Sequence, residues 1–227
     1  MKNKHNLAFI LCFLVVSPMI ILSSCNENTA TNHNPSTTES LANAAKISIK
    51  TSPQASQHPH YKQFNLDMQH YIDSYNKNYW DEVYETMYPP MHGGKSKDDV
   101  MTNFVKAKLM GMERQVNDVK IEKISDVVED GKNLYCKIYF SSNVAVKVSG
   151  QALENKDYIL TNLELSYDTQ DINYDEATQT FNIPDAYTSM IAISKKGANL
   201  WKYIEIDKQK EPLLVNVIPK AVLDKLD

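Results

Sequence analysis

Tyrosine and carboxylate side chains are the groups in this chain best suited to acid–base chemistry. An isomerase-type site combines a carboxylate base with a hydroxyl that stabilises an oxyanion in an apolar pocket. Asp67, Asp73 and Glu85 are candidate bases. Of the 13 tyrosines, five are candidates to line a cleft: Tyr71, Tyr75, Tyr84, Tyr139 and Tyr203. Because no spacing separates these residues from ordinary core and surface positions, packing is the competing interpretation of the tyrosines.

Histidine and cysteine add little further chemistry. His58 and His60 could touch a metal, but a third ligand is missing, so we expect no metal site. We expect His70 and His92 to be structural or exposed. Cys136 alternates with apolar residues, which predicts a buried, inert thiol. The sequence contains no H-E-x-x-H, G-x-S-x-G, C-x-x-C or G-x-G-x-x-G motif, so we expect no cofactor.

The balance of charge argues against a further class of function. The chain has 24 Lys and Arg residues against 28 Asp and Glu residues, a net charge of −4, and Arg114 is its only arginine. Nucleic-acid binding needs a basic face, usually with bidentate arginine contacts. We therefore expect no nucleic-acid partner.

The first 25 residues carry the features of an export signal. Lys2 and Lys4 precede an apolar stretch over residues 7–22, which is shorter than the roughly 20 residues of a membrane-spanning helix. The stretch ends in Leu22-Ser23-Ser24-Cys25. This segment resembles the lipobox of bacterial lipoproteins, which has an apolar residue, two small residues and a cysteine. An uncleaved signal anchor and an ordinary signal peptide with an incidental cysteine are the alternatives.

The lipobox resemblance implies lipidation of the Cys25 thiol and removal of residues 1–24 as a signal peptide. Three acyl chains on the new N-terminus would anchor the mature chain in a membrane. Asn26 follows the cysteine, where an aspartate would indicate retention in the inner membrane of some enteric bacteria. We therefore expect a lipid-anchored protein of the cell envelope, at the outer membrane of a Gram-negative bacterium.

The chain after the lipobox divides into a tether and one domain. Residues 25–59 are rich in Asn, Thr, Ser and Ala with little apolar periodicity, which predicts a disordered tether. Within this tether, residues 46–50 alternate and are a candidate short strand. The remaining residues, 60–227, are expected to form a single domain.

The domain begins with three predicted helices. Apolar residues at three- and four-residue steps predict a first helix over 61–79, with a mostly aromatic stripe: Tyr61, Phe64, Met68, Tyr71, Ile72, Tyr75 and Tyr79. A second helix starts near Trp80 and stops at Pro89-Pro90. Ser96 and Asp99 have the spacing of a capping box and predict the start of a third helix.

From residue 116 onward the apolar period changes to 2, which predicts strands. We expect strands at 119–124 (with a bulge), 134–148, 159–167, 189–194 and 200–206, a turn at Asp130-Gly131 and a small hairpin at 172–183. Residues 212–226 are expected to form two short helices divided at Pro219. The predicted class is α+β, with three N-terminal helices on a curved antiparallel sheet and short C-terminal helices.

Residues 61–206 resemble the nuclear-transport-factor-2-like (cystatin-like cone) fold. The resemblance rests on the order of elements, the aromatic first helix, Trp80, Tyr88-Pro89-Pro90 and Trp201. It implies a strongly bent sheet that wraps the helices into a cone whose mouth can hold a small apolar ligand. Some relatives are isomerases or dehydratases that use Asp, His or Tyr, so the fold permits an enzyme without implying one.

Three functions follow as alternatives. The favoured one is a non-enzymatic binding or accessory protein of the envelope, with another envelope protein or a small ligand as its partner. The second is a cofactor-free lyase or isomerase that acts on a small apolar substrate in the cone. The third is a glycan-binding accessory lipoprotein that uses tyrosine and tryptophan faces. The first is favoured because a clear anchor signal stands beside no recognisable catalytic constellation.

Overall fold

The computed structural model describes residues 48–198, 200–208 and 210–226. The expected signal peptide, Cys25 and the expected tether up to residue 47 lie outside the described residues. The remainder of the expected tether, 48–59, is folded, which corrects the predicted boundary at residue 60. It contains strand β1 (Lys50–Thr51) and the 3-10 helix η1 (Ala55–Gln57). Ser52 donates its amide to the carbonyl of Ile121 at 2.9 Å, and Ala55 is buried.

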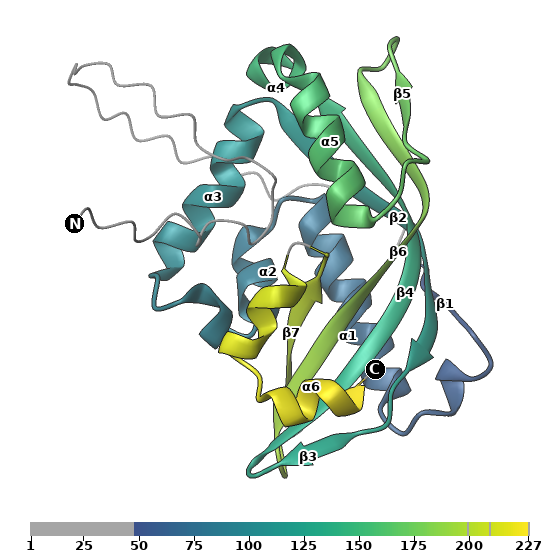
Figure 1. Cartoon of the computed structure of the whole chain (residues 1–227), viewed down its shortest axis with the longest axis vertical. Helices are drawn as coiled ribbons and strands as arrows, with labels where there is room; N and C mark the ends of the chain where they lie inside the picture. Colours follow the sequence, from purple (N-terminus) through teal and green to yellow (C-terminus); the bar gives the residue numbers. More distant parts are fainter. Residues whose placement is uncertain (1–47, 199, 209, 227) are drawn as a thin grey trace, which may run out of the picture.

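The three predicted N-terminal helices are confirmed (Figure 1). They are α1 (Tyr61–Asn76), α2 (Trp80–Thr86) and α3 (Lys97–Leu109), and the 3-10 helix η2 (Pro89–His92) follows the predicted stop of α2. The Ser96 hydroxyl accepts the amide of Asp99, and the Asp99 carboxylate accepts the amide of Ser96. This reciprocal pair is the predicted capping box.

The first helix ends earlier than its aromatic stripe predicted. Asn78 has a positive φ of 61°, which breaks the helix and leaves Tyr79 as the N-cap of α2. Tyr79 is consequently 43% exposed. The rest of the stripe from Phe64 to Tyr75 is buried. Stacking of Trp80 on Phe104, with ring centroids 4.8 Å apart, joins α2 to α3.

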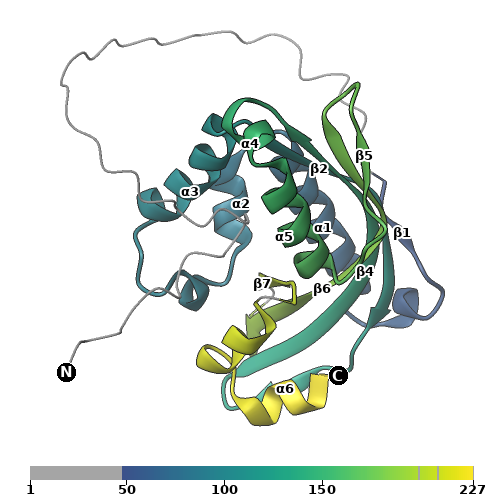
Figure 2. The same ribbon diagram turned by 45° about the horizontal axis from the view of Figure 1, so that its top comes forward.

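A mostly antiparallel, curved sheet of seven strands follows the helices (Figure 2). Its further strands are β2 (Met112–Ile124), β3 (Val128–Asp130), β4 (Asn133–Val148), β5 (Asn173–Asp175), β6 (Thr180–Lys195) and β7 (Trp201–Ile206). The strand order is β1-β2-β4-β6-β5, with β3 also paired to β4 and β7 to β6. The short β1 pairs in parallel with β2.

Several strand predictions are confirmed in detail. The register of β2 against β4 shifts between Ile121 and Lys123, where the sequence predicts the bulge, and a second shift lies between Asn117 and Lys120. The hairpin β3–β4 turns at Gly131, whose φ is 58°. By contrast, β6 is one long strand, where the sequence predicted the arm of a hairpin and a separate strand at 189–194. Pro184 and the positive φ of Asp185 make β6 irregular without ending it.

The predicted strand at 159–167 is wrong, because these residues form a helix. After β4 come α4 (Gly150–Glu154) and α5 (Lys156–Tyr167). A strand would point Ile159, Leu163 and Leu165 to one face. A helix instead places Ile159 and Leu163 on the same side, four residues apart, and turns Leu165 away. Ile159 and Leu163 are buried, whereas Leu165 is 56% exposed.

The two faces of the sheet are covered by different parts of the chain. Helices α1 and α5 lie within its concave side (Figure 2), over inward β4 residues such as Ile138 and Val146. Part of the outer face is covered by the two predicted C-terminal helices, η3 (Glu211–Asn216) and α6 (Lys220–Leu226). There Tyr135 and Ile191 pack with Leu214 in a second apolar cluster. The predicted α+β class is therefore confirmed.

Within the described part of the chain, no helix combines the length and apolarity that crossing a membrane requires.

Candidate functional site

An open groove of about 410 Å³ lies between α1, α2 and β7. Four carboxylates line it: Asp67 from α1, and Asp81, Glu82 and Glu85 from α2. The β7 side supplies Trp201, Lys202 and Tyr203, and the preceding Leu200 is 64% exposed. The helical spacing of α1 and α2 sets the carboxylates along one side, and alternation in β7 turns Trp201 and Tyr203 the same way.

Asp67 and Tyr203 join α1 to β7 across the bottom of this groove. The Tyr203 hydroxyl donates a short hydrogen bond to the Asp67 carboxylate. Gln63, one turn earlier in α1, donates to the other Asp67 oxygen at 2.6 Å. Burial and the negative charge of Asp67 raise the pKa of the Tyr203 hydroxyl. The phenol therefore stays protonated and acts as a donor to the carboxylate.

The α2 side of the groove is also hydrogen-bonded. Glu82 accepts the Ser74 hydroxyl at 2.5 Å and lies 3.9 Å from His70. Lys97 of α3 lies 2.7 Å from an Asp81 oxygen and pairs with Glu85 as well. Lys202 donates its ammonium group to the backbone carbonyl of Glu85. The groove is thus a preformed, net acidic surface with an aromatic floor.

A second group of charged residues lies in the interior, between α1, β2, β7 and α5. Arg114 of β2 pairs with Glu205 of β7, with Nη2 and Oε1 3.1 Å apart. The guanidinium lies over the rings of Tyr75 and Tyr167, 5.3 and 5.9 Å from their centroids. Burial raises the pKa of Tyr167 to about 12. Because the two rings pack on the guanidinium group, protein side chains fill this part of the interior.

The C-terminal segment adds a third charge beside this interior pair. Lys210 is 4% exposed, and its Nζ atom lies 2.8 Å from Oδ2 of Asp207. Burial alone raises the pKa of Glu205, but the charges of Arg114 and Lys210 outweigh it and hold that pKa below its usual value. The cavity beside Glu205 and Lys210 has a volume of about 20 Å³, which is room for about one water molecule.

The structure brings together three of the five tyrosines predicted to line a cleft. Tyr71 and Tyr203 border the small cavity, and Tyr75 packs beneath Arg114. Tyr84 instead stacks on His92, with centroids 4.7 Å apart. Tyr139 lies on the outer face of the sheet, where its hydroxyl donates to the carbonyl of Leu226. Of the candidate bases, Asp67 lines the groove and Glu85 faces it from α2, whereas Asp73 pairs with Lys77 on the surface.

Sequence reasoning missed the two interior charges. Arg114 shares strand parity with the buried Val116 in β2. Glu205 likewise alternates with Trp201 and Tyr203. A charged residue in phase with the core face of a strand was the signal that could have found both.

The remaining histidines and the cysteine are packing groups. Cys136 is buried as predicted, donates its thiol to the carbonyl of Ser125 at 3.1 Å and lies 3.6 Å from His58. Burial raises the pKa of its thiol to about 12. His60 packs against Trp201 at 5.1 Å. Over the described ranges, no three His, Cys, Asp or Glu side chains are grouped to hold a metal ion.

The chain matches no protein-family model. No curated protein shows significant sequence similarity to it.

Proposed function

We propose that this protein is a lipid-anchored, non-enzymatic binding module of the cell envelope. In this proposal the lipid at Cys25 anchors the chain at the outer membrane, and the folded region receives a partner in the groove between α1, α2 and β7. The fold is proposed to be of the nuclear-transport-factor-2-like type. Its order of elements and the curved sheet that encloses α1 support that assignment.

The observation that carries the proposal is that the larger cavity is a groove on the surface, whereas the cavity beside Glu205 is small. The groove of about 410 Å³ is on the surface, within the range of about 300–1,000 Å³ that is usual for ligand sites. The interior cavity of about 20 Å³ cannot hold a substrate. Its neighbouring carboxylate, Glu205, is neutralised by Arg114. These two features favour a binding site on the surface over an isomerase or lyase site at this cavity.

The chemistry of the groove favours a basic segment of another envelope protein as the partner. Four carboxylates face Lys202 and the neighbouring Lys97, so the surface carries net negative charge. Trp201 and the exposed Leu200 add apolar contact area beside that charge. Such a surface complements lysine or arginine side chains, whose long aliphatic stems pack on apolar groups.

Site-specific crosslinking in cells tests the groove. A photoreactive residue at Leu200, 64% exposed at the groove, is expected to capture a discrete envelope protein through a basic segment. The same residue at Leu109, 80% exposed at the end of α3, is the matched control and is expected to capture none. Adding Glu82→Gln should weaken the Leu200 crosslink. Equal capture from both positions, or none from Leu200, would overturn the proposal.

The lipid anchor is tested separately by Cys25→Ala. The variant is expected to lose incorporation of labelled fatty acid and to leave the membrane fraction, because a single cysteine carries the proposed acyl chains. Unchanged labelling and fractionation would refute lipidation at this residue. The groove proposal would stand or fall independently, on the crosslinking result.

A further inference from the structure

Helix α3 has one buried face and one face that is open to solvent. Val100, Phe104 and Ala107 point into the domain, at spacings of three and four residues. On the other side of the helix, Val105 and Leu109 lie one turn apart and are 44% and 80% exposed. In the described part of the chain, no other large apolar side chain is as exposed as Leu109. We call these two side chains, Val105 and Leu109, the α3 ridge.

Two lysines flank the α3 ridge. At about 3.6 residues per turn, Lys106 lies on one side of the ridge and Lys108 on the other. Both side chains are exposed, and over the described ranges no carboxylate forms an ion pair with either ammonium group. The carboxylates of α3, on Asp98 and Asp99, lie in its first turn, roughly 12 Å away along the helix axis. The unpaired positive charge of α3 is therefore at the same end as the ridge.

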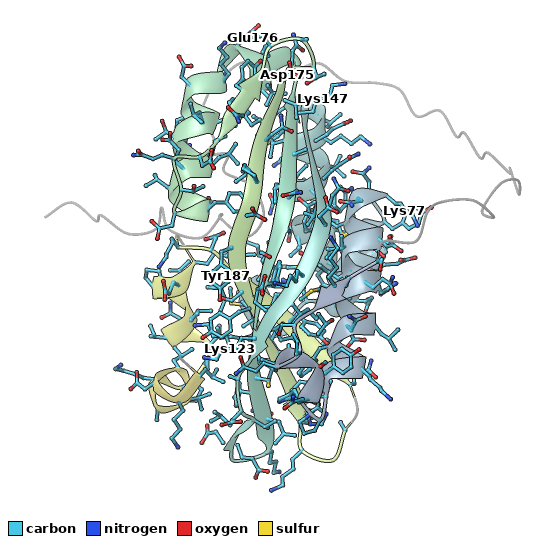
Figure 3. The ribbon with its side chains drawn as sticks, turned by 90° about the vertical axis from the view of Figure 1, so that its right-hand side faces the viewer. Lys77, Lys123, Lys147, Asp175, Glu176 and Tyr187 are labelled. Carbon is cyan, nitrogen blue, oxygen red and sulfur yellow. The ribbon has the colours of Figure 1, made fainter. Side chains whose placement is uncertain are left out.

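The side of the domain away from α3 has a different character. In Figure 1, α3 and the outer face of the sheet lie on opposite sides of the domain. Figure 3 looks onto that outer face and labels Lys123 and Lys147 together with Asp175 and Glu176, all of them exposed. Tyr187, labelled in the same view, is 57% exposed. Charges of both signs are mixed there, whereas the end of α3 combines apolar side chains with charge of one sign.

We propose that the C-terminal end of α3 lies on an anionic phospholipid surface, with the α3 ridge in the headgroup region and Lys106 and Lys108 at the phosphates. Apolar side chains gain free energy on leaving water at this depth. Lysine side chains can keep their aliphatic stems beside the ridge while their ammonium groups reach the phosphates. The inference rests on the membrane attachment in the proposed function, because that attachment brings the domain to a lipid surface.

The charge of the whole chain selects this end of α3. The net charge is −4, so an anionic surface repels most of the domain and attracts the turn that carries Lys106 and Lys108. The carboxylates of Asp98 and Asp99 are repelled as well, and they lie at the other end of the helix. We therefore expect α3 to contact the membrane obliquely, with Leu109 deeper than Val105.

Quenchers carried by the lipid test the contact. The full chain, purified in mild detergent, is reconstituted into vesicles of phosphatidylethanolamine and phosphatidylglycerol whose acyl chains carry bromine. A fluorescent amino acid in place of Leu109 should be quenched about twofold or more, because an interfacial side chain lies roughly 5–10 Å into the headgroup and acyl boundary. The same amino acid in place of Tyr187, on the face shown in Figure 3, is the matched control and should not be quenched.

Charge variants test the role of the lysines. Lys106→Gln combined with Lys108→Gln should reduce the quenching at position 109 severalfold, and so should raised salt, because the contact includes exposed charges. Lys62→Gln on α1 combined with Lys225→Gln on α6 also removes two exposed positive charges and should leave the quenching unchanged. Vesicles of phosphatidylcholine alone should give the reduced value, because they carry no anionic headgroup.

Flotation of the same vesicles separates this inference from the lipid anchor. A chain that floats with the vesicles but is not quenched at position 109 would overturn the α3 contact and leave the anchor standing. Equal quenching at positions 109 and 187 would overturn the contact too, and equal quenching in phosphatidylcholine would overturn its preference for anionic lipid. Crosslinking of two copies through position 109, without quenching, would assign the α3 ridge to a dimer interface instead. Circular dichroism of each variant confirms that the fold is intact.

Discussion

Arg114 and Glu205 form an ion pair inside the domain, 91 residues apart in the chain. Their side chains are 15% and 10% exposed. Tyr71 donates a further hydrogen bond to Glu205 at 3.3 Å. Taking both charges out of water is costly, and the cost is offset only while each charge has its partner. The pair therefore ties β2, β7 and α1 together in one specific arrangement.

Removing one member of this pair is expected to cost far more than removing both. Glu205→Gln leaves the Arg114 charge buried without its counterion, and should lower the free energy of unfolding by about 3–5 kcal/mol. The double variant Arg114→Met, Glu205→Met should lose less than this single variant, because no uncompensated charge remains. Urea unfolding of the three proteins measures both values. A single variant as stable as the double variant would contradict the buried-pair interpretation.

Gly111, at the junction of α3 and β2, is predicted to tolerate no side chain. Its φ is 90°, and a Cβ atom there would lie 2.0 Å from the carbonyl oxygen of Ser149. That contact cannot relax easily, since the Ser149 amide also donates to Gly111 at 2.8 Å. Gly111→Ala is expected to destabilise the fold by about 3 kcal/mol or more.

Gly94 provides the matched control for this position. Its φ is also positive, 77°, but an added Cβ would meet no atom within 4 Å. Gly94→Ala should therefore cost only the backbone term, about 1–2 kcal/mol. Thermal and urea unfolding compare the two variants. Equal losses would mean that the clash with Ser149 is relieved by movement of the chain.

Cys136 is predicted to be unreactive in the folded protein. Its side chain is buried, and burial raises the pKa of the thiol to about 12. The thiolate, which is the reactive form, is therefore scarce at pH 8. A disulfide reagent such as DTNB should label Cys136 only after denaturation, tested in a Cys12→Ala, Cys25→Ala background so that Cys136 is the single thiol. Rapid labelling of the native protein would show that the β4 region opens readily.

The three N-terminal helices and most strands are predictable from the sequence because their signals are local. The capping box at Ser96 and the turn at Gly131 depend on neighbouring residues only, and both were predicted correctly. Residues 159–167 were mistaken for a strand because apolar residues at positions 159, 163 and 165 satisfy both a two-residue and a four-residue spacing. Burial of Leu163 and exposure of Leu165 distinguish the two, and burial is a tertiary property.

The candidate site was less predictable than the fold for the same reason. Asp67 was recognised as a candidate base and Tyr203 as a candidate cleft residue, but their hydrogen bond spans 136 positions. No spacing rule connects residues of a first helix and a last strand. The interior ion pair is also long-range, and only strand parity hinted at its members. Long-range pairing therefore decided which of the candidates meet.

Histidine burial predicts how stability changes between pH 7 and pH 5. His92 is 7% exposed, and burial lowers its pKa from the usual value of 6.5. The pKa of His58 is lowered too, first by burial and then by the charge of His60. Between pH 7 and pH 5 these two histidines bind more protons in the unfolded chain than in the folded one. Their contribution to the free energy of unfolding therefore falls as the pH decreases below about 6.5.

His92→Phe isolates the contribution of His92 to this pH dependence. The ring can still stack on Tyr84, while the titrating group is gone. Urea unfolding at pH 7 and pH 5 should show a smaller loss of stability for His92→Phe than for the wild type. His58 keeps titrating in the variant and should account for part of the remaining loss. An unchanged pH dependence in His92→Phe would mean that His92 is protonated equally in the folded and unfolded states.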